Sequence, residues 1–306
     1  MRIQVYFISI FLLLFLSCYK EDSLILDIEL FPDRTQDFTL WQLDQYKDVS
    51  QMGYIIKTDD DKTIVIDGGD SNISDLLYNY ILQLGGTVHY WVITHPHKDH
   101  AGALNSILSK NEININIESV IYSRLDLELI RVHEELSHSF ANEFYTRIDK
   151  TDIQQLEPLI GDVLNLGEGV ELNILGIKNP KILINHVNNS SLVFQVKSKT
   201  KSVLFVGDLG IEGGEIVLNN NELASLQSNY IQMSHHGQDG VSKDFYSAIA
   251  ANIALWPTPK WLWENNLDAK GYDSGPWKTL IVKNWMDELG VSRNIVAGIE
   301  GTIQID

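Results

Sequence analysis

Short apolar stretches recur along the chain at a spacing that predicts a sheet-rich core with helices between the strands. Several are rich in β-branched and aromatic residues, and some alternate with polar residues as the strands of a half-buried sheet do. We predict strands over residues 24–30, 52–58, 63–66, 88–94, 117–122, 170–177, 191–196, 202–206 and 298–305. Helical patterns lie between them, which favours an α/β fold. No linker rich in Pro, Gly or Ser interrupts the pattern, so we expect one large domain over residues 24–306.

One helical pattern is long. Over residues 127–148, apolar side chains recur at near-helical spacing at Ile130, Leu136, Phe140, Phe144 and Ile148. This spacing predicts an amphipathic helix that packs on a sheet or covers the functional site. His133 and His138 on this helix are five residues apart, not the four that would align two ligands on one face. We interpret them as ordinary surface or core histidines.

The first twenty residues are typical of a bacterial export signal. Arg2 precedes an apolar run from Val5 to Leu16 that is too short to span a bilayer, and Ser17 and Cys18 follow it. Cys18 is the single cysteine, so no intramolecular disulfide can form, and its expected use is as a lipidated N-terminal residue. We therefore expect a signal peptide over residues 1–17, a lipidated cysteine and polar tether over residues 18–23, and an extracytoplasmic lipoprotein. The alternatives, an uncleaved anchor or a plain secretory leader, also place the chain outside the cytoplasm.

The residues from Cys18 to Asp22 carry a finer signal. They resemble the short charged segment that marks surface-exposed lipoproteins in one group of Gram-negative bacteria. A plain polar tether is an equal alternative. The expected location is therefore the outer membrane, with the choice between periplasm and cell surface left open.

The most informative chemistry lies in six residues, which run His95-Pro96-His97-Lys98-Asp99-His100. A buried strand pattern precedes this cluster and a helical pattern follows it, so the cluster is predicted to lie on a strand-to-helix turn. Residues i and i+2 of an extended segment project to the same side, so His95 and His97 can bind one ion. Asp99 and His100 lie after the chain bends and face a second ion.

These residues resemble the metallo-β-lactamase-fold hydrolases, whose signature is His-x-His-x-Asp-His at such a turn. Further family motifs follow in the expected order at residues 63–69, 202–208 and 230–237. The resemblance implies an αβ/βα four-layer sandwich with a dinuclear metal site at the sheet edge where the two halves meet. It implies that two ions are held by His95, His97, Asp99, His100, Asp208 and His235, with Asp208 shared. Asp67 is expected to support the ligands, and His235 is favoured over His236 as the ligand because it ends the strand.

The chain departs from the family pattern at one position. Most members place a histidine between the first cluster and the bridging aspartate, where this chain has Asn188-Asn189-Ser190-Ser191. This form resembles the branch containing the hydrolase domain of ComEC-type DNA-uptake proteins. We expect Asn188 or water to complete the first ion's coordination, with His186 as an alternative. The missing imidazole argues against an authentic β-lactamase.

The ligand set implies hydrolysis by a hydroxide that bridges two ions and attacks phosphorus or a carbonyl carbon. Asp99 and His236 are the candidates for catalytic roles. His236 is expected to donate a proton to the leaving group or to bind a phosphate oxygen. Imidazole and carboxylate ligands favour two zinc ions, with manganese or iron as alternatives. The chain offers no G-x-S-x-G nucleophile elbow.

Tryptophan is concentrated near the C-terminus, where five of the 7 residues of this type fall between Trp256 and Trp285. Rings on proline-rigidified loops can form a stacking wall for a sugar, a base or a quaternary ammonium group. Trp261 and Trp263 are the candidates for substrate binding. Trp277 and Trp285 are expected to cover the edge of the sandwich.

The net charge of the chain limits the class of substrate that it can bind. The chain has 23 Lys+Arg against 41 Asp+Glu and a formal net charge of −18, whereas polyanion binding depends on basic residues that neutralise phosphates. A long nucleic acid is therefore a poor partner. We expect a small-molecule or cell-surface phosphodiester as substrate and the membrane as a partner through the N-terminal lipid. The alternatives are hydrolysis of a carboxylic ester, lactone or amide, or a metal-binding lipoprotein without turnover. The sequence leaves the oligomeric state open.

Overall fold

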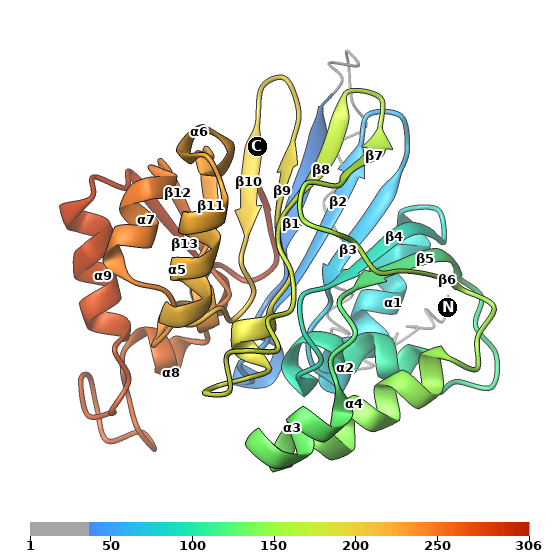
Figure 1. Ribbon diagram of the computed structural model, residues 1–306, viewed down its shortest axis with the longest axis horizontal. Helices are drawn as coiled ribbons and strands as arrows, with labels where there is room; N and C mark the ends of the chain where they lie inside the picture. Colours follow the sequence, from blue (N-terminus) through green and yellow to red (C-terminus); the bar gives the residue numbers. More distant parts are fainter. Residues whose placement is uncertain (1–36, 306) are drawn as a thin grey trace, which may run out of the picture.

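Two seven-stranded sheets lie face to face in the computed structural model, which describes residues 37–305 (Figure 1). The expectations for residues 1–23 and for a strand at 24–30 lie outside the described residues. The first sheet has the order β14-β1-β2-β3-β4-β5-β6. Its strands are β1 (Phe38–Gln42), β2 (Gly53–Thr58), β3 (Thr63–Asp67), β4 (Thr87–Ile93), β5 (Asn116–Tyr122), β6 (Gln154–Leu156) and β14 (Ile303–Ile305).

The second sheet has the order β13-β12-β11-β10-β9-β8-β7. Its strands are β7 (Val163–Gly167), β8 (Val170–Gly176), β9 (Val193–Lys197), β10 (Ser202–Phe205), β11 (Tyr230–Gln232), β12 (Ile253–Trp256) and β13 (Arg293–Val296). Both sheets are mixed: β3, β4, β5 and β6 run parallel in the first, and β10, β11, β12 and β13 run parallel in the second.

The central strands are apolar on both faces because each sheet is covered on both sides. All five residues of β3 are buried. Ile64 and Ile66 point into the core between the sheets, and Val65 points into the core between the first sheet and its helices. In the second sheet, Phe194 and Phe205 stack at 5.2 Å within the central core, and Tyr54 of the first sheet meets Phe205 edge-on.

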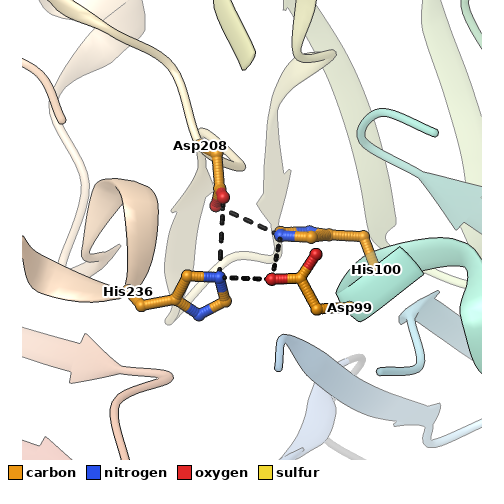
Figure 2. Close-up of side chains that lie close together, drawn as sticks. All are labelled: Asp99, His100, Asp208 and His236. Carbon is orange, nitrogen blue, oxygen red and sulfur yellow. Dashed lines mark hydrogen bonds and ion pairs between the residues drawn. The ribbon is translucent and has the colours of Figure 1, made fainter. Parts of the chain in front are cut away.

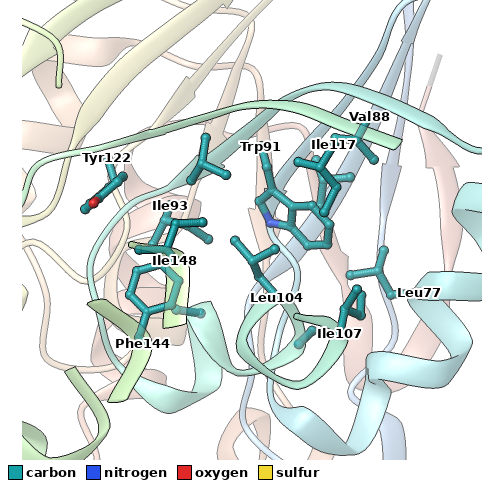
Figure 3. Packing of buried hydrophobic residues seen from close by; sticks show 14 of the residues in the cluster. Leu77, Val88, Trp91, Ile93, Leu104, Ile107, Ile117, Tyr122, Phe144 and Ile148 are labelled. Atoms are coloured by element: carbon teal, nitrogen blue, oxygen red, sulfur yellow. The ribbon is translucent and has the colours of Figure 1, made fainter. Parts of the chain in front are cut away.

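Helices cover the outer face of each sheet. The first sheet is covered by α1 (Ser74–Gln83), α2 (Lys98–Ile107) and α4 (Glu135–Ile148), whose side chains enclose the fully buried Trp91 and its neighbours (Figure 3). The second sheet is covered by α5 (Ile211–Asn220), α6 (Leu223–Leu226), α7 (Lys243–Ile249) and α9 (Thr279–Glu288). The predicted αβ/βα four-layer sandwich is thus confirmed.

The short elements are α3 (Leu127–His133), α8 (Lys260–Trp263), α10 (Ala297–Glu300) and the single turns η1 (Tyr46–Asp48), η2 (Ser71–Ile73), η3 (Asn188–Ser190) and η4 (Ser234–Gly237). None of the helices within residues 37–305 combines the length and apolar character needed to cross a bilayer.

Two sequence predictions differ from the structure. The expected helix over residues 127–148 is two helices, α3 and α4, because Glu134 between them has the non-helical angles φ −153° and ψ 59°. The expected strand over residues 298–305 begins as the last helix α10, which ends at Gly301 with φ 74°, and only Ile303–Ile305 forms a strand. The other predicted strands within the described residues match strands of the two sheets to within about two residues at each end.

Candidate metal centre

The histidine cluster lies on the turn from β4 into α2, as predicted. His97 is the residue before the helix and keeps extended angles of φ −85° and ψ 155°, while Asp99 and His100 lie in the first helical turn. Asp208 follows β10, and His236 follows β11. Because β10 and β11 are parallel, their carboxyl ends place Asp208 and His236 at the same edge of the second sheet.

Six side chains form two overlapping groups at this edge. In each group the potential ligand atoms lie within 4.8 Å of one another. One group is His95, His97 and Asp208, and the other is Asp99, His100, Asp208 and His236. Figure 2 shows the second group, in which side chains from α2 and from the two strand ends point toward one another. His236 Nε2 lies 3.1 Å from Asp99 Oδ2 and 3.5 Å from Asp208 Oδ2, and His100 Nε2 lies 3.2 Å from Asp208 Oδ1.

In the second group, each imidazole is held by the ring nitrogen that faces away from the cluster. His100 Nδ1 donates to Asp67 Oδ2 at 2.7 Å, and His236 Nδ1 donates to the carbonyl oxygen of Pro257 at 2.9 Å. A carbonyl or ionised carboxylate oxygen only accepts, so the proton of each neutral ring sits on Nδ1. The lone pair on Nε2 is then free for a cation, which is the usual arrangement of metal-binding histidines.

The first group follows the same rule. His97 Nε2 donates to Glu134 Oε1 at 2.5 Å, which leaves the lone pair of His97 Nδ1 facing His95 Nε2 at 3.0 Å. His95 Nδ1 lies 3.0 Å from Thr94 Oγ1 and 3.3 Å from Ser191 Oγ. Either hydroxyl can accept its proton, and His95 then presents Nε2 to the same point as His97 Nδ1.

Asp67 lies behind His100 at the end of β3 and accepts three hydrogen bonds. It accepts from the backbone N–H of Thr94 at 2.7 Å, from Thr94 Oγ1 at 2.8 Å and from His100. Its φ of 54° is in the left-handed region, which is uncommon for a residue other than glycine. This conformation at the end of β3 is held by the bond from Trp91 Nε1 to the Asp67 carbonyl at 2.7 Å.

The electrostatics of the site are those of a cation-binding cluster. Burial acts to lower the pKa of His100, but the charges of Asp208, Asp67 and Asp99 raise it well above its usual range. His236 behaves similarly: burial opposes the charged form, and Asp208 and Asp99 raise its pKa to about 10. Burial, together with the neighbouring His100 and His97, lowers the pKa of His95 well below normal. The carboxylates therefore attract positive charge, which protons on His100 and His236 supply when no metal is bound.

Two buried polar atoms further support the fit to divalent cations. His100 Nε2 and Asp208 Oδ1 are buried 3.2 Å from each other and have no other hydrogen-bond partner, although buried polar atoms are nearly always satisfied. Both point into the cluster. His100 and Asp208, together with Asp99 and His236, would hold one cation, and His95, His97 and Asp208 would hold another.

The turn after β11 places His236, not His235, in the cluster. His235, His236 and Gly237 all have positive φ, at 49°, 55° and 77°, a strained run that rotates His236 inward. The turn is fixed because the hydroxyl of Thr258 donates to the His236 carbonyl at 2.6 Å and because a Cβ on Gly237 would lie 2.1 Å from the Trp256 ring. His235 is partly exposed and its Nε2 lies 3.9 Å from Asp208 Oδ2. The sequence analysis favoured His235 as the ligand, whereas this geometry favours His236.

The polar segment after β8 contacts the cluster and its surroundings through Ser191 and Asn189, to which the sequence analysis assigned no role. Ser191 Oγ contacts His95 and accepts from the Asp208 backbone N–H at 3.2 Å. Asn189 Oδ1 accepts from the N–H groups of Gly210 and Gly213 at the start of α5, just after Asp208. Asn188 is buried and its Oδ1 has no hydrogen-bond partner. His186 Nε2 is also buried and unpartnered, but it is absent from both metal-binding groups of the described residues.

Glu134 is the functional residue that the sequence analysis missed. Its carboxylate accepts from His97 and also from the Val187 backbone N–H at 3.0 Å. Burial acts to raise the pKa of Glu134, and the bonds from His97 and Val187 lower it below normal. The apolar spacing held a signal: the gap from Ile130 to Leu136 breaks the four-residue register of the helical pattern, and Leu136 is 98% exposed.

The tryptophans proposed for substrate binding have different environments. Trp263 packs edge-on against the buried Trp256 at 5.0 Å, and the Lys283 amino group lies 3.8 Å from its ring centre. It is partly buried and packs against the core between the second sheet and its helices. Trp261 is partly exposed, contacts Trp277 at 4.9 Å and donates to the Asp48 carbonyl at 2.8 Å. Trp261 thus remains the candidate of the two for contact with substrate.

Comparison with known proteins gives the same assignment. The profile of the Metallo-beta-lactamase superfamily matches residues 47–252. RNase aCSPSF2 of Saccharolobus solfataricus is 23% identical over 226 residues, which are 66% of this chain and 44% of that protein. The chain therefore spans less than half the length of this relative.

Solved structures show the same fold. The metallo-beta-lactamase fold protein YhfI of Bacillus subtilis matches with a TM-score of 0.52 at 11% identity, over 88% of this chain and all of that one. The E377D mutant of the CmlA beta-hydroxylase matches with a TM-score of 0.50 at 11% identity, over 89% of this chain and 54% of that one. The profile match over residues 47–252 shows that the chain belongs to the metallo-beta-lactamase superfamily, and the two facing sheets and the paired His/Asp groups agree with that membership.

Proposed function

We propose that the protein is a dinuclear phosphodiesterase that acts outside the cytoplasm on a small or cell-surface phosphodiester. The observation that carries this proposal is the position of Asp208, which belongs to both metal-binding groups. A carboxylate shared by two cations is suited to hold them close together, as two-metal phosphoryl-transfer sites require. The similarity to a protein named as an RNase supports phosphodiester chemistry.

Zinc is the proposed metal, because imidazole and carboxylate donors suit it and zinc accepts low coordination numbers. A pair of such cations supplies Lewis acidity, which stabilises negative charge on phosphate oxygens and makes water a stronger nucleophile near neutral pH. Asn188 is proposed to complete the first group through its unpartnered Oδ1.

The protein's own residues orient the substrate and move protons. We assign to His235 the role that the sequence analysis gave to His236. The outer nitrogen of His235 donates to the Asp239 carbonyl at 3.2 Å, and its Nε2 lies beside the cluster on a partly exposed side chain. From this position it can contact a phosphate oxygen or a leaving group. Asp99 binds metal and pairs with His236.

The substrate is proposed to be smaller than a nucleic acid. The net charge of −18 opposes binding along a polyanion. The resemblance of the Asn188 segment to ComEC-type hydrolase domains nevertheless keeps cleavage of a nucleic acid as a second candidate, as does the match to an RNase. We also propose that Cys18 is lipidated and anchors the protein to the outer membrane.

Parallel hydrolysis assays test the proposal. Bis-p-nitrophenyl phosphate, p-nitrophenyl acetate and a short labelled RNA are offered to the same zinc-loaded protein, with chelator-treated protein as the control. We expect chelator-sensitive hydrolysis of the phosphodiester with little cleavage of the acetate. Cleavage of the acetate alone would overturn the phosphodiester assignment, and efficient RNA cleavage that falls steeply with added salt would favour the second candidate. Two bound ions without turnover of any substrate would leave only metal binding.

A further inference from the structure

One carboxylate connects the first metal-binding group to two surface segments. Glu134 lies at the break between α3 and α4, where its Oε1 accepts from His97 Nε2 at 2.5 Å and from Ser137 Oγ at 2.9 Å. Its Oε2 accepts from the Val187 backbone N–H at 3.0 Å. The side chain is only 20% exposed. The loss of helical geometry at Glu134 therefore coincides with a specific set of three hydrogen bonds.

The two groups differ in how much they depend on such support. The second group has four side-chain ligands, whereas the first has three and lacks a third imidazole. With fewer ligands, the first cation depends more on the basicity and orientation of each one. His97 is also the more exposed of the two imidazoles in the first group, at 19% against 0% for His95.

We propose that Glu134 is a positioning residue that sets the affinity of the first group for its cation by fixing the tautomer and orientation of His97. The inference rests on the proposed dinuclear function. Glu134 binds no metal itself. Its negative charge makes the His97 ring a stronger ligand for the cation.

The substitution Glu134→Gln tests this role with little change in shape. His97 Nε2 and the Val187 N–H bond to different oxygens of Glu134, and in glutamine one of these oxygens is replaced by an NH2 group that only donates, so one of the two bonds is lost. We expect two zinc ions to bind the wild-type protein, and expect Glu134→Gln to weaken one of them by about 10- to 100-fold while leaving the other unchanged. The measurement is zinc titration against a chromophoric chelator of known affinity, which needs no substrate.

Two backgrounds show which ion responds. In the Asp99→Ala background, in which the second group has lost a ligand, Glu134→Gln should still lower the affinity for the ion of the first group. In His97→Ala, which removes the partner of Glu134, the same substitution should add no further loss. Glu143→Gln is the matched control, because Glu143 is a glutamate of α4 that belongs to neither metal-binding group and pairs with Arg147 at 2.8 Å.

If the substitution loosened the whole fold, the protein would bind both ions more weakly. A positioning role predicts weaker binding of the first ion alone. Unchanged affinity for both ions in a folded Glu134→Gln protein overturns the proposal, as does equal weakening of both. Should Glu134→Gln fail to fold, Glu134→Asp keeps the charge but shortens the reach, and it should weaken the first ion by less. Because the readout is metal affinity, a wild-type protein that hydrolyses no phosphodiester would refute the proposed function without touching this inference.

Discussion

The two metal-binding groups share Asp208 but are built on different kinds of support. The second group is anchored inside the sandwich: His100 is fully buried against Asp67 at the end of β3, and the 2% exposed His236 is held by the Pro257 carbonyl after β12. The first group is anchored by Glu134 and Ser191, which lie in connecting segments. Segments of this kind tolerate sequence change better than strand ends do. We therefore expect the second group to be the rigid half of the centre and the first to be the adjustable half.

The largest effect is expected where the two halves meet. Asp208→Ala removes a ligand from both groups and leaves His100 and His236 without their shared partner. Activity on a phosphodiester should fall by on the order of 1,000-fold or more, and bound zinc should fall below one ion per chain. Retention of two ions, measured by elemental analysis, would show that Asp208 is not shared.

The halves should also differ in stability without metal. His100→Ala leaves the buried Asp67 without its ion-pair partner, so at pH 7 we expect a loss of about 3–5 kcal/mol in the free energy of unfolding. His97→Ala affects a partly exposed pair with Glu134 and should cost about 1 kcal/mol. Urea unfolding of chelator-treated proteins measures both. Equal losses would contradict the distinction between a rigid and an adjustable half.

The two neighbouring histidines after β11 are expected to have different roles, one in metal binding and one in proton transfer. His235→Ala should keep two zinc ions and lose about 100-fold in kcat, the typical contribution of a proton-transfer residue. His236→Ala should lose the second ion. Zinc content measured beside activity separates the two variants, and the reverse pattern would restore His235 as the ligand.

The smallest expected effect is an increase in the affinity for the first ion. Asn188→His supplies an imidazole at the position where most family members have one, and the Asn188 Oδ1 atom has no partner to lose. We expect tighter binding of the first ion by about tenfold, about 1.4 kcal/mol. Zinc competition measures the change, with Asn189→His as the control, because Asn189 is fully engaged with Ile184, Gly210 and Gly213. An equal change in both variants would contradict the assignment of Asn188 to the first group.

Sequence pattern predicted the parts of this site that depend on local structure. Asp67 ends β3, and the His95–His100 cluster and Asp208 follow β4 and β10, and the apolar run of each strand is recognisable in the sequence by itself. The choice of His236 over His235 depends on three consecutive positive φ angles, which apolar periodicity does not encode. Glu134 was missed because its partner His97 is 37 residues away and meets it across a helix break. The packing of Trp263 against Trp256 is a tertiary contact, which sequence pattern does not encode.

The last described strand, β14, forms the edge of the first sheet next to β1. β14 pairs antiparallel with β1, so that Leu40 lies opposite Ile305, and Lys201 from the second sheet donates to the Phe38 carbonyl beside this pair. Contacts between such distant parts of a chain form late and slow the folding reaction. Synthesis must therefore extend through β14 before this edge can close, and until then β1 has an unpaired edge that is prone to aggregation.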